Sequence, residues 1–376
     1  MFKLARKQLA LDLVRTSLTA FAVGAVIAVI LVLEGFEQGQ YRQLEQIILK
    51  RNADLIATQS GVANFTAARS SLPQLARQDV ESVAGVVNAH PLTVLPIIYN
   101  KENKLTPVYI LVYDTRGGPD SIIEGSAIRK GRDIVIDRAL ARKYGLKIGD
   151  GFVVSDFEFQ ISGITGEAAF FMPFAFVSYD GMIDLFLKSE IAPDLSTFPL
   201  LSFLLIELEP GSDRMAIQQD IERQVPEVDV FTPEQLAERD VSMGRTFYRP
   251  IMGLLDTVAY VVGLLVVSLI LFADVRSRLR SFAVMKALGF TQRHLLLLVL
   301  AQSLMLMALA LPIGLLLAQA LMMYIEAVAP VYLISIYQPL VFARTMIASL
   351  LLALIGALVP LRSLRRSDPV MAFQGA

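Results

Sequence analysis

The sequence predicts a membrane protein with four transmembrane α-helices and a large α+β extracytoplasmic domain inserted between helices 1 and 2. Its 376 residues are 55% hydrophobic, with a mean hydropathy of +0.56. That is too apolar for an ordinary soluble protein and too charged for a chain made only of spans. Apolar runs long enough to cross a bilayer occupy residues 17–33, 250–273, 295–325 and 345–361. Between the first two runs, residues 52–232 have the mixed pattern of an α+β domain.

The distribution of positive charge predicts the orientation. Segments 1–16, 274–294 and 362–376 are rich in Lys and Arg, and basic segments that flank spans stay in the cytoplasm. We therefore expect a multi-pass protein of the inner (plasma) membrane with both termini in the cytoplasm and the loop 326–344 outside. A cleaved signal peptide is the competing interpretation of the N-terminus. The long first apolar run and the lack of a clear small-x-small cleavage site argue against it.

Helical sequence continues beyond the membrane on the external side. Residues 34–51 are expected to form a stalk helix, because apolar residues recur on one face: Tyr41, Leu44, Ile47 and Ile48. A separate surface helix is the alternative. Residues 233–249 are expected to form a second stalk that leads into the second span. Thr232 is its predicted N-cap and Pro233 its first helical residue.

The external domain is predicted to start and end in βαβ-like units around a more β-rich insertion, residues 115–195. Ser212 or Asp213 is expected to cap a helix over 213–225. Within the insertion, residues 168–179 are unusually aromatic. They form either buried core, the commoner outcome, or an exposed patch for a hydrophobic substrate or partner. The patch residues would be Phe170, Phe171, Met172, Phe174 and Phe176.

No catalytic or metal site is predicted. The sequence has no G-x-x-x-x-G-K-[ST] phosphate loop, no H-E-x-x-H and no G-x-S-x-G motif. It has no cysteine, and its two histidines, His90 and His294, lack ligand-like spacing. A net charge of −1 offers nucleic acid no global attraction. One intramembrane acid, Asp256, is interpreted as structural because it is only about two turns from the external end of its span.

The basic segment 274–294 is predicted to contain a short amphipathic helix along the cytoplasmic face of the membrane. Phe282, Met285 and Leu288 recur at helical spacing. Gly289 is a suitable C-cap before the turn into the third span.

Three features together resemble one known family. The order is one span, a domain of about 200 residues, then three spans. The string MKALGF (Met285–Phe290) follows an Arg-rich segment, and the chain closes with VPLRSLRRSDPVMAF (Val359–Phe373). The chain resembles the membrane subunits of FtsX/MacB/LolC-type (type VII) ABC transporters and is most similar to separate permeases of the DevC type. One departure is Ser281, where the family usually has an acidic residue.

The resemblance implies specific partners and residue roles. The coupling helix to a separate ABC ATPase subunit, which would bind the ATP, would comprise Arg278, Ser281, Phe282, Met285, Lys286, Ala287, Leu288, Gly289 and Phe290. This chain itself would bind no cofactor. A second permease copy would complete a homodimer or heterodimer among membrane lipids. The resemblance leaves open whether a periplasmic adaptor (membrane fusion protein) and an outer-membrane channel take part.

The implied function is export or extraction of a lipid, lipoprotein or other hydrophobic compound by mechanotransmission. In this mechanism ATP hydrolysis by the partner moves the periplasmic domain through the stalks. The alternative is a non-transporting signalling subunit of the FtsX type that regulates cell-envelope hydrolases. A weaker third option is a membrane-anchored sensor without an ATPase, which the basic loop motif disfavours.

Overall fold

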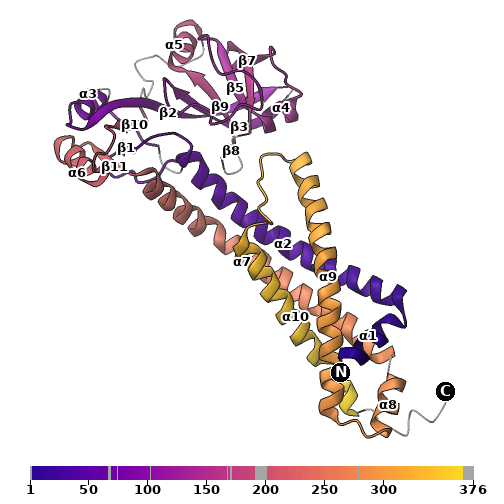
Figure 1. The fold of residues 1–376 in the computed structure, drawn as a ribbon. Helices are drawn as coiled ribbons and strands as arrows, with labels where there is room; N and C mark the ends of the chain where they lie inside the picture. The colour runs from indigo at the N-terminus through magenta and orange to yellow at the C-terminus, as the bar shows by residue number, and fades with distance from the viewer. Residues whose placement is uncertain are drawn as a thin grey trace. The chain divides into compact units, whose positions relative to one another are not determined.

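The computed structural model describes residues 2–66, 69–73, 75–101, 103–166, 168–169, 172–190, 201–277 and 279–366. It divides into two compact units. The membrane unit comprises Met1–Gly39, Arg249–Ala327 and Ile334–Ala376, and the sheet unit comprises Gln40–Tyr248 and Val328–Leu333. The boundaries between the units fall inside α2 and α7 and before the last residue of α9. Figure 1 labels these three helices.

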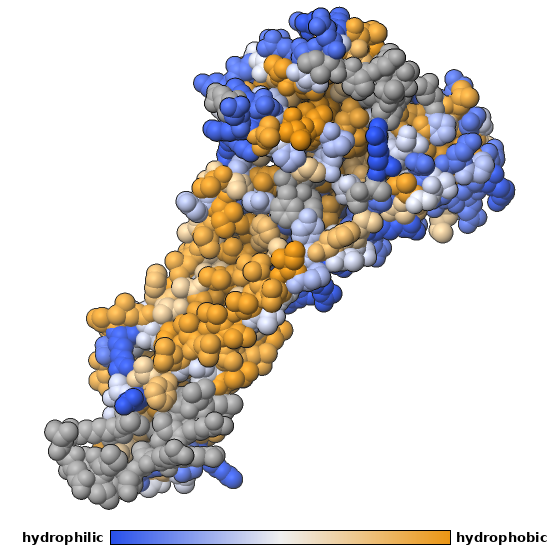
Figure 2. Space-filling model, turned by 180° about the vertical axis from the view of Figure 1, so that it is seen from behind, coloured by the Kyte–Doolittle hydropathy of each residue, from blue (hydrophilic) through white to orange (hydrophobic). Residues whose placement is uncertain are grey.

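Four helices of the described chain are long and apolar enough to cross a membrane. They are α2 (Leu13–Leu49), α7 (Pro233–Ser277), α9 (Gln292–Val328) and α10 (Pro339–Arg366). Figure 2 shows the largely hydrophobic surface over these helices. The predicted fold class is confirmed: four apolar helices, with the mixed sheet domain between the first and the second.

Small residues bring the helices of the membrane unit close together. A Cβ atom added to Gly24 on α2 would lie 3.0 Å from the carbonyl oxygen of Ala310 on α9, and one added to Gly314 would lie 2.9 Å from the Gly24 oxygen. Such close backbone approach is typical of helix packing in lipid, where no hydrophobic force drives helices together. The N-terminal helix α1 (Phe2–Ala10) joins the same buried cluster through Ala5.

The sheet unit is built on one sheet, with eleven strands among the described residues. The path is β11-β1-β10-β2-β3-β9-β5-β7-β4, with β6 beside β7 and β8 beside β9. The strands are β1 (Leu55–Gln59), β2 (Val86–Lys101), β3 (Lys104–Tyr113), β4 (Glu124–Gly125), β5 (Asp133–Asp137), β6 (Gly151–Val154), β7 (Phe157–Thr165), β8 (Ala168–Ala169), β9 (Met172–Ser178), β10 (Phe203–Leu208) and β11 (Val228–Phe231). The β3–β9 and β5–β7 pairs are parallel and the others antiparallel.

Two pairs of short helices pack against the sheet, one pair near each end of the strand order. Near β1, β10 and β11 the helices are α3 (Ala76–Glu81) and α6 (Arg214–Gln224). The Asp213 carboxylate caps α6 by accepting from the Met215 and Ala216 N–H groups, which decides between the two predicted caps. Near β5 to β7 the helices are α4 (Arg138–Tyr144) and α5 (Tyr179–Lys188).

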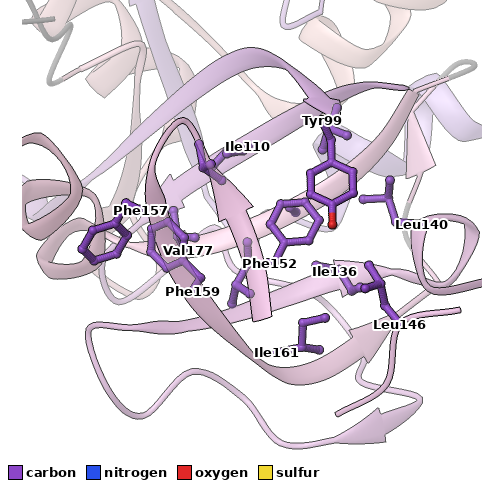
Figure 3. Close-up of a cluster of buried hydrophobic side chains, with 14 of the residues drawn as sticks. Tyr99, Ile110, Ile136, Leu140, Leu146, Phe152, Phe157, Phe159, Ile161 and Val177 are labelled. Carbon is purple, nitrogen blue, oxygen red and sulfur yellow. The ribbon is translucent and has the colours of Figure 1, made fainter. Parts of the chain in front are cut away.

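The segment predicted as a β-rich insertion shares the sheet of the rest of the domain. It contributes β4 to β9, and β9 pairs in parallel with β3. Its core is aromatic: the ring of Phe152 stacks on that of Tyr99 with centroids 4.1 Å apart (Figure 3). Strand pairing and this shared core therefore join the segment to the strand pair β2–β3.

Replacing Gly24 by Leu is predicted to lower the melting temperature of the detergent-purified protein. The added side chain has no space between α2 and α9, and overpacking of a tight contact is destabilising. Gly253→Leu on α7 is the matched control, because nothing lies within 4 Å of a Cβ atom at that glycine. Equal melting temperatures for the two variants would contradict the packing described for α2 and α9.

Candidate functional site

The short helix α8 (Leu279–Ala287) lies between α7 and α9 and ends in a Schellman motif. The Phe290 N–H donates to the Met285 carbonyl at 3.1 Å, and the Gly289 N–H donates to the Lys286 carbonyl at 3.0 Å. Gly289 has a φ of +87°, a left-handed conformation that glycine adopts without steric cost. The predicted C-cap at Gly289 is therefore confirmed.

The two faces of α8 differ in their surroundings. Phe282 and Met285 are buried in the core of the membrane unit, and Phe290 packs against the same core. On the other face Val284 is 45% exposed and Leu288 is 74% exposed. We call the exposed residues Ser281, Val284, Ala287 and Leu288 the docking face.

The sequence prediction for this helix covered both faces. Phe282 and Met285 attach α8 to the spans, so their side chains are not free to contact a partner. Val284 was missed, although its spacing from Ser281 and Leu288 places the three on one side of a helix. Lys286 is half-buried, and Arg278 lies outside the described residues.

An ion pair at the end of α7 adjoins this segment. Arg15 lies 3.4 Å from the carboxylate of Asp274 and donates to the Ala273 carbonyl at 3.1 Å. Asp274 is the single acid of the segment 274–294, so its pairing with Arg15 leaves the segment strongly basic.

The described residues of the predicted aromatic patch are buried or half-buried. Phe174 and Phe176 are fully buried, so the core interpretation holds for these two rings, while Met172 is half-buried. Phe170 and Phe171 lie outside the described residues. Exposed apolar side chains of the sheet unit do occur on the β2–β3 hairpin, at Ile98 and Leu105.

A buried arginine joins the end of α2 to the sheet unit. Arg51 has no exposed surface. Its Nε donates to the Ile47 carbonyl and its Nη1 to the carbonyls of Gly117 and Gly118, each at 2.8 Å. The guanidinium also lies over the ring of Phe176, 5.4 Å from its centroid. A buried charge with these contacts fixes the helix end to the loop at 117–118.

A buried aspartate joins the start of α7 to the loop at 65–66 of the sheet unit. Asp240 accepts from the N–H of Phe65 at 2.8 Å, and from the N–H and hydroxyl of Thr66 at 3.1 and 2.9 Å. Burial raises the pKa of this carboxyl, and the three hydrogen bonds partly oppose the rise. Together we call Arg51 and Asp240 the anchors.

Apolar contacts reinforce the anchors. Ile47 and Ile48 of α2 and Leu236 and Ala237 of α7 share one buried cluster with strand residues such as Phe203. The two helices also pack on each other in the sheet unit. A Cβ atom added to Gly244 would lie 2.6 Å from Leu44, and Arg245 lies over the Tyr41 ring.

The comparisons with known proteins decide the family. Residues 17–224 match the model of the MacB-like periplasmic core domain, which is more than half of the chain. Residues 254–369 match the model of the FtsX-like permease C-terminal region. The chain belongs to the FtsX-like permeases with a MacB-like periplasmic core domain. An ABC transporter permease of this family implies a partner ATPase.

Curated relatives agree with this assignment. The uncharacterized ABC transporter permeases Rv0072 and Rv2563 of Mycobacterium tuberculosis are each 22% identical to this permease, over 367 and 370 residues. Each alignment covers 96% of both chains.

Two solved structures are also similar. One is the extracellular domain of the noncanonic ABC-type transporter YknZ from Gram-positive bacteria, 13% identical, with a TM-score of 0.35, covering 48% of this permease and all of that chain. The other is the periplasmic region of MacB from Actinobacillus actinomycetemcomitans, 7% identical, with a TM-score of 0.37, covering 51% and 94%.

Asp240→Asn is predicted to destabilise the permease by about 1–3 kcal/mol, because an amide has one acceptor atom and leaves at least one buried N–H donor unpaired. Thermal unfolding of the purified protein measures the change. Glu238→Gln, an exposed position on the same helix, is the control and should leave unfolding unchanged. A variant as stable as the control would show that Asp240 is not an anchor.

Proposed function

We propose that this permease couples a separate ABC ATPase to movement of its sheet unit, and so exports or extracts a lipid, lipoprotein or other hydrophobic compound. The observation that carries the proposal is the docking face. Val284 and Leu288 expose apolar surface in a basic segment between two spans, while the opposite face of α8 is buried in the membrane unit. An exposed apolar face on a rigidly held helix is suited to a protein partner.

The ATPase is proposed to supply the ATP chemistry. The printed sequence carries no phosphate loop, so ATP would bind to the partner subunit and not to this permease. Closure of two ATPase subunits would press on α8 in each of two permease copies. Phe282 and Met285 would transfer that load to the spans, because they are packed into the membrane unit.

The stalk helices are proposed to carry the movement onward. α2 and α7 are unbroken helices of 37 and 45 residues, and each belongs partly to the membrane unit and partly to the sheet unit. The anchors fix the far ends of both helices to the sheet unit, so a tilt of either helix would move that unit. The second permease copy would pack on α7, where apolar residues are exposed along the span: Leu254, Leu255, Val258, Val261, Val262, Leu265 and Leu269.

A hydrophobic substrate taken from the outer leaflet or the periplasm fits the composition of the helices. The spans carry few acidic or basic residues and so offer no evident polar route through the membrane. The proposed mechanism does not require one, because the substrate does not cross the spans. Ile98 and Leu105 on the β2–β3 hairpin offer exposed apolar surface in the sheet unit. A periplasmic adaptor and an outer-membrane channel are further partners to be sought by co-purification. Activation of a cell-envelope hydrolase without transport would instead favour the FtsX-type signalling role.

Val284→Arg combined with Leu288→Arg is predicted to abolish co-purification with the ATPase encoded beside this permease. Two charges would replace the apolar surface of the docking face, while α8 itself should fold, since both positions are exposed. Leu187→Arg, on an exposed site of α5, is the matched control and should bind normally. If the double variant still binds the ATPase, α8 is not the coupling helix.

Single-cysteine labelling tests the proposed orientation without background, because the chain has no cysteine of its own. Gln292→Cys, in the same basic segment but outside the docking face, should react with a membrane-impermeant maleimide only after the inner membrane is opened, and Leu187→Cys should react in spheroplasts. Both side chains are exposed, so access depends on the side of the membrane. The reverse labelling pattern would overturn the assignment of the termini to the cytoplasm.

A further inference from the structure

A buried carboxyl group lies among three helices of the membrane unit. Glu34 on α2 is 6% exposed. Its Oε1 accepts a hydrogen bond from the hydroxyl of Tyr260 on α7. Its Oε2 is buried and has no hydrogen-bond partner among the described residues.

The charges around Glu34 do not balance. Asp256 on α7 and Glu37 on α2 add negative charge, and Arg344 on α10 is the one cation among its charged neighbours in the described chain. The segment 334–338, which packs over Gly35, adds one titratable group, Tyr337, whose hydroxyl is bonded to Gln319. Among the charges that act on Glu34, two carboxyl groups thus oppose one guanidinium.

This environment disfavours an ionised Glu34. A buried carboxylate needs charge pairing and hydrogen bonds to both oxygens, and an uncompensated one costs far more than an unpaired neutral hydroxyl. Tyr260 supplies one bond, and the exposed Arg344 is shared with Asp256. A proton on Oε2 would remove the charge and relieve the repulsion.

The packing selects a proton over a larger cation. Oε2 is closed to solvent, and a Cβ atom added to the adjacent Gly35 would lie 2.9 Å from the Ile336 side chain. The described residues include no group of three or more His, Cys, Asp or Glu side chains arranged to hold a metal ion. A proton is the one cation that needs no cavity.

We propose that Glu34 is a proton-binding site between α2 and α7, and that its proton stabilises the contact of these two helices. The step is a simple acid–base exchange: solvent supplies a proton to the Glu34 carboxylate, the neutral acid forms, and release returns the proton to water. Loss of the proton would leave a buried charge with one oxygen unpaired between the helices and so favour separation of α2 from α7. The proposal rests on the proposed function and adds regulation to it: the proton at Glu34 would control α2 and α7, the two helices proposed to carry movement to the sheet unit.

Infrared difference spectroscopy of the full-length permease in lipid nanodiscs tests for the proton directly. Acidic and alkaline samples are compared for wild type, Glu34→Gln and Glu37→Gln. The site predicts a protonated carboxyl band that disappears in Glu34→Gln and persists in Glu37→Gln. If the wild-type and Glu34→Gln spectra share the same band, Glu34 is ionised and the proposal is wrong. No ATPase is present, so the result is independent of whether α8 docks one.

Thermal unfolding across the same pH series tests the effect on the helices. Since the folded state holds one proton that the unfolded chain has released, stability should fall as pH rises. The unfolding constant should increase by up to about tenfold per pH unit between the pH at which glutamate of the unfolded chain loses its proton and the higher pH at which Glu34 of the folded chain does. Glu34→Gln keeps the shape and an acceptor for Tyr260, so it should fold and lose this dependence, whereas Glu37→Gln should retain it. An unchanged pH dependence in Glu34→Gln would overturn the stabilising role.

Discussion

Burial of the two anchors is the constraint on which the rest of this structure depends. The guanidinium of Arg51 and the carboxyl of Asp240 have both been removed from water at the junction between a stalk helix and the sheet unit. Leaving a buried polar group without its partner costs about 1–3 kcal/mol, and more for a charged group, so each helix end is held in one position relative to the loops at 117–118 and 65–66. The movement proposed to pass through α2 and α7 requires helix ends that are fixed in this way.

The contrast with surface charges shows why these two residues matter. Ion pairs such as Arg223–Asp220 and Lys188–Asp184 are exposed, and pairs of this kind contribute little because water and salt compete for the charges. The anchors use backbone groups as partners, whose positions are set by the sheet. They also adjoin the apolar cluster formed by Ile47, Ile48 and Leu236. Directional hydrogen bonds and apolar burial therefore act at the same place, where the helices meet the strands.

Local patterns in the sequence predicted much of this fold. Apolar runs identified the four apolar helices, and Gly289 marked the end of α8. Features that depend on distant contacts were not predictable. Nothing near Arg51 in the sequence indicates burial against Gly117, 66 residues away. Phe174 and Phe176 are enclosed by strands that only the tertiary fold brings together. Periodicity predicted that α8 is amphipathic, yet the spans decide that Phe282 faces inward and Val284 outward.

The most direct test of mechanotransmission is the distance between the two sheet units of a permease dimer bound to its ATPase. Spin labels at Leu187→Cys, an exposed site in an otherwise cysteine-free chain, would report it by electron–electron dipolar spectroscopy in nanodiscs. The account predicts that a non-hydrolysable ATP analogue shifts the distance distribution, and that Arg51→Met loses the shift while ATP hydrolysis continues. A distribution that is the same with and without nucleotide, in a complex that hydrolyses ATP, would contradict it.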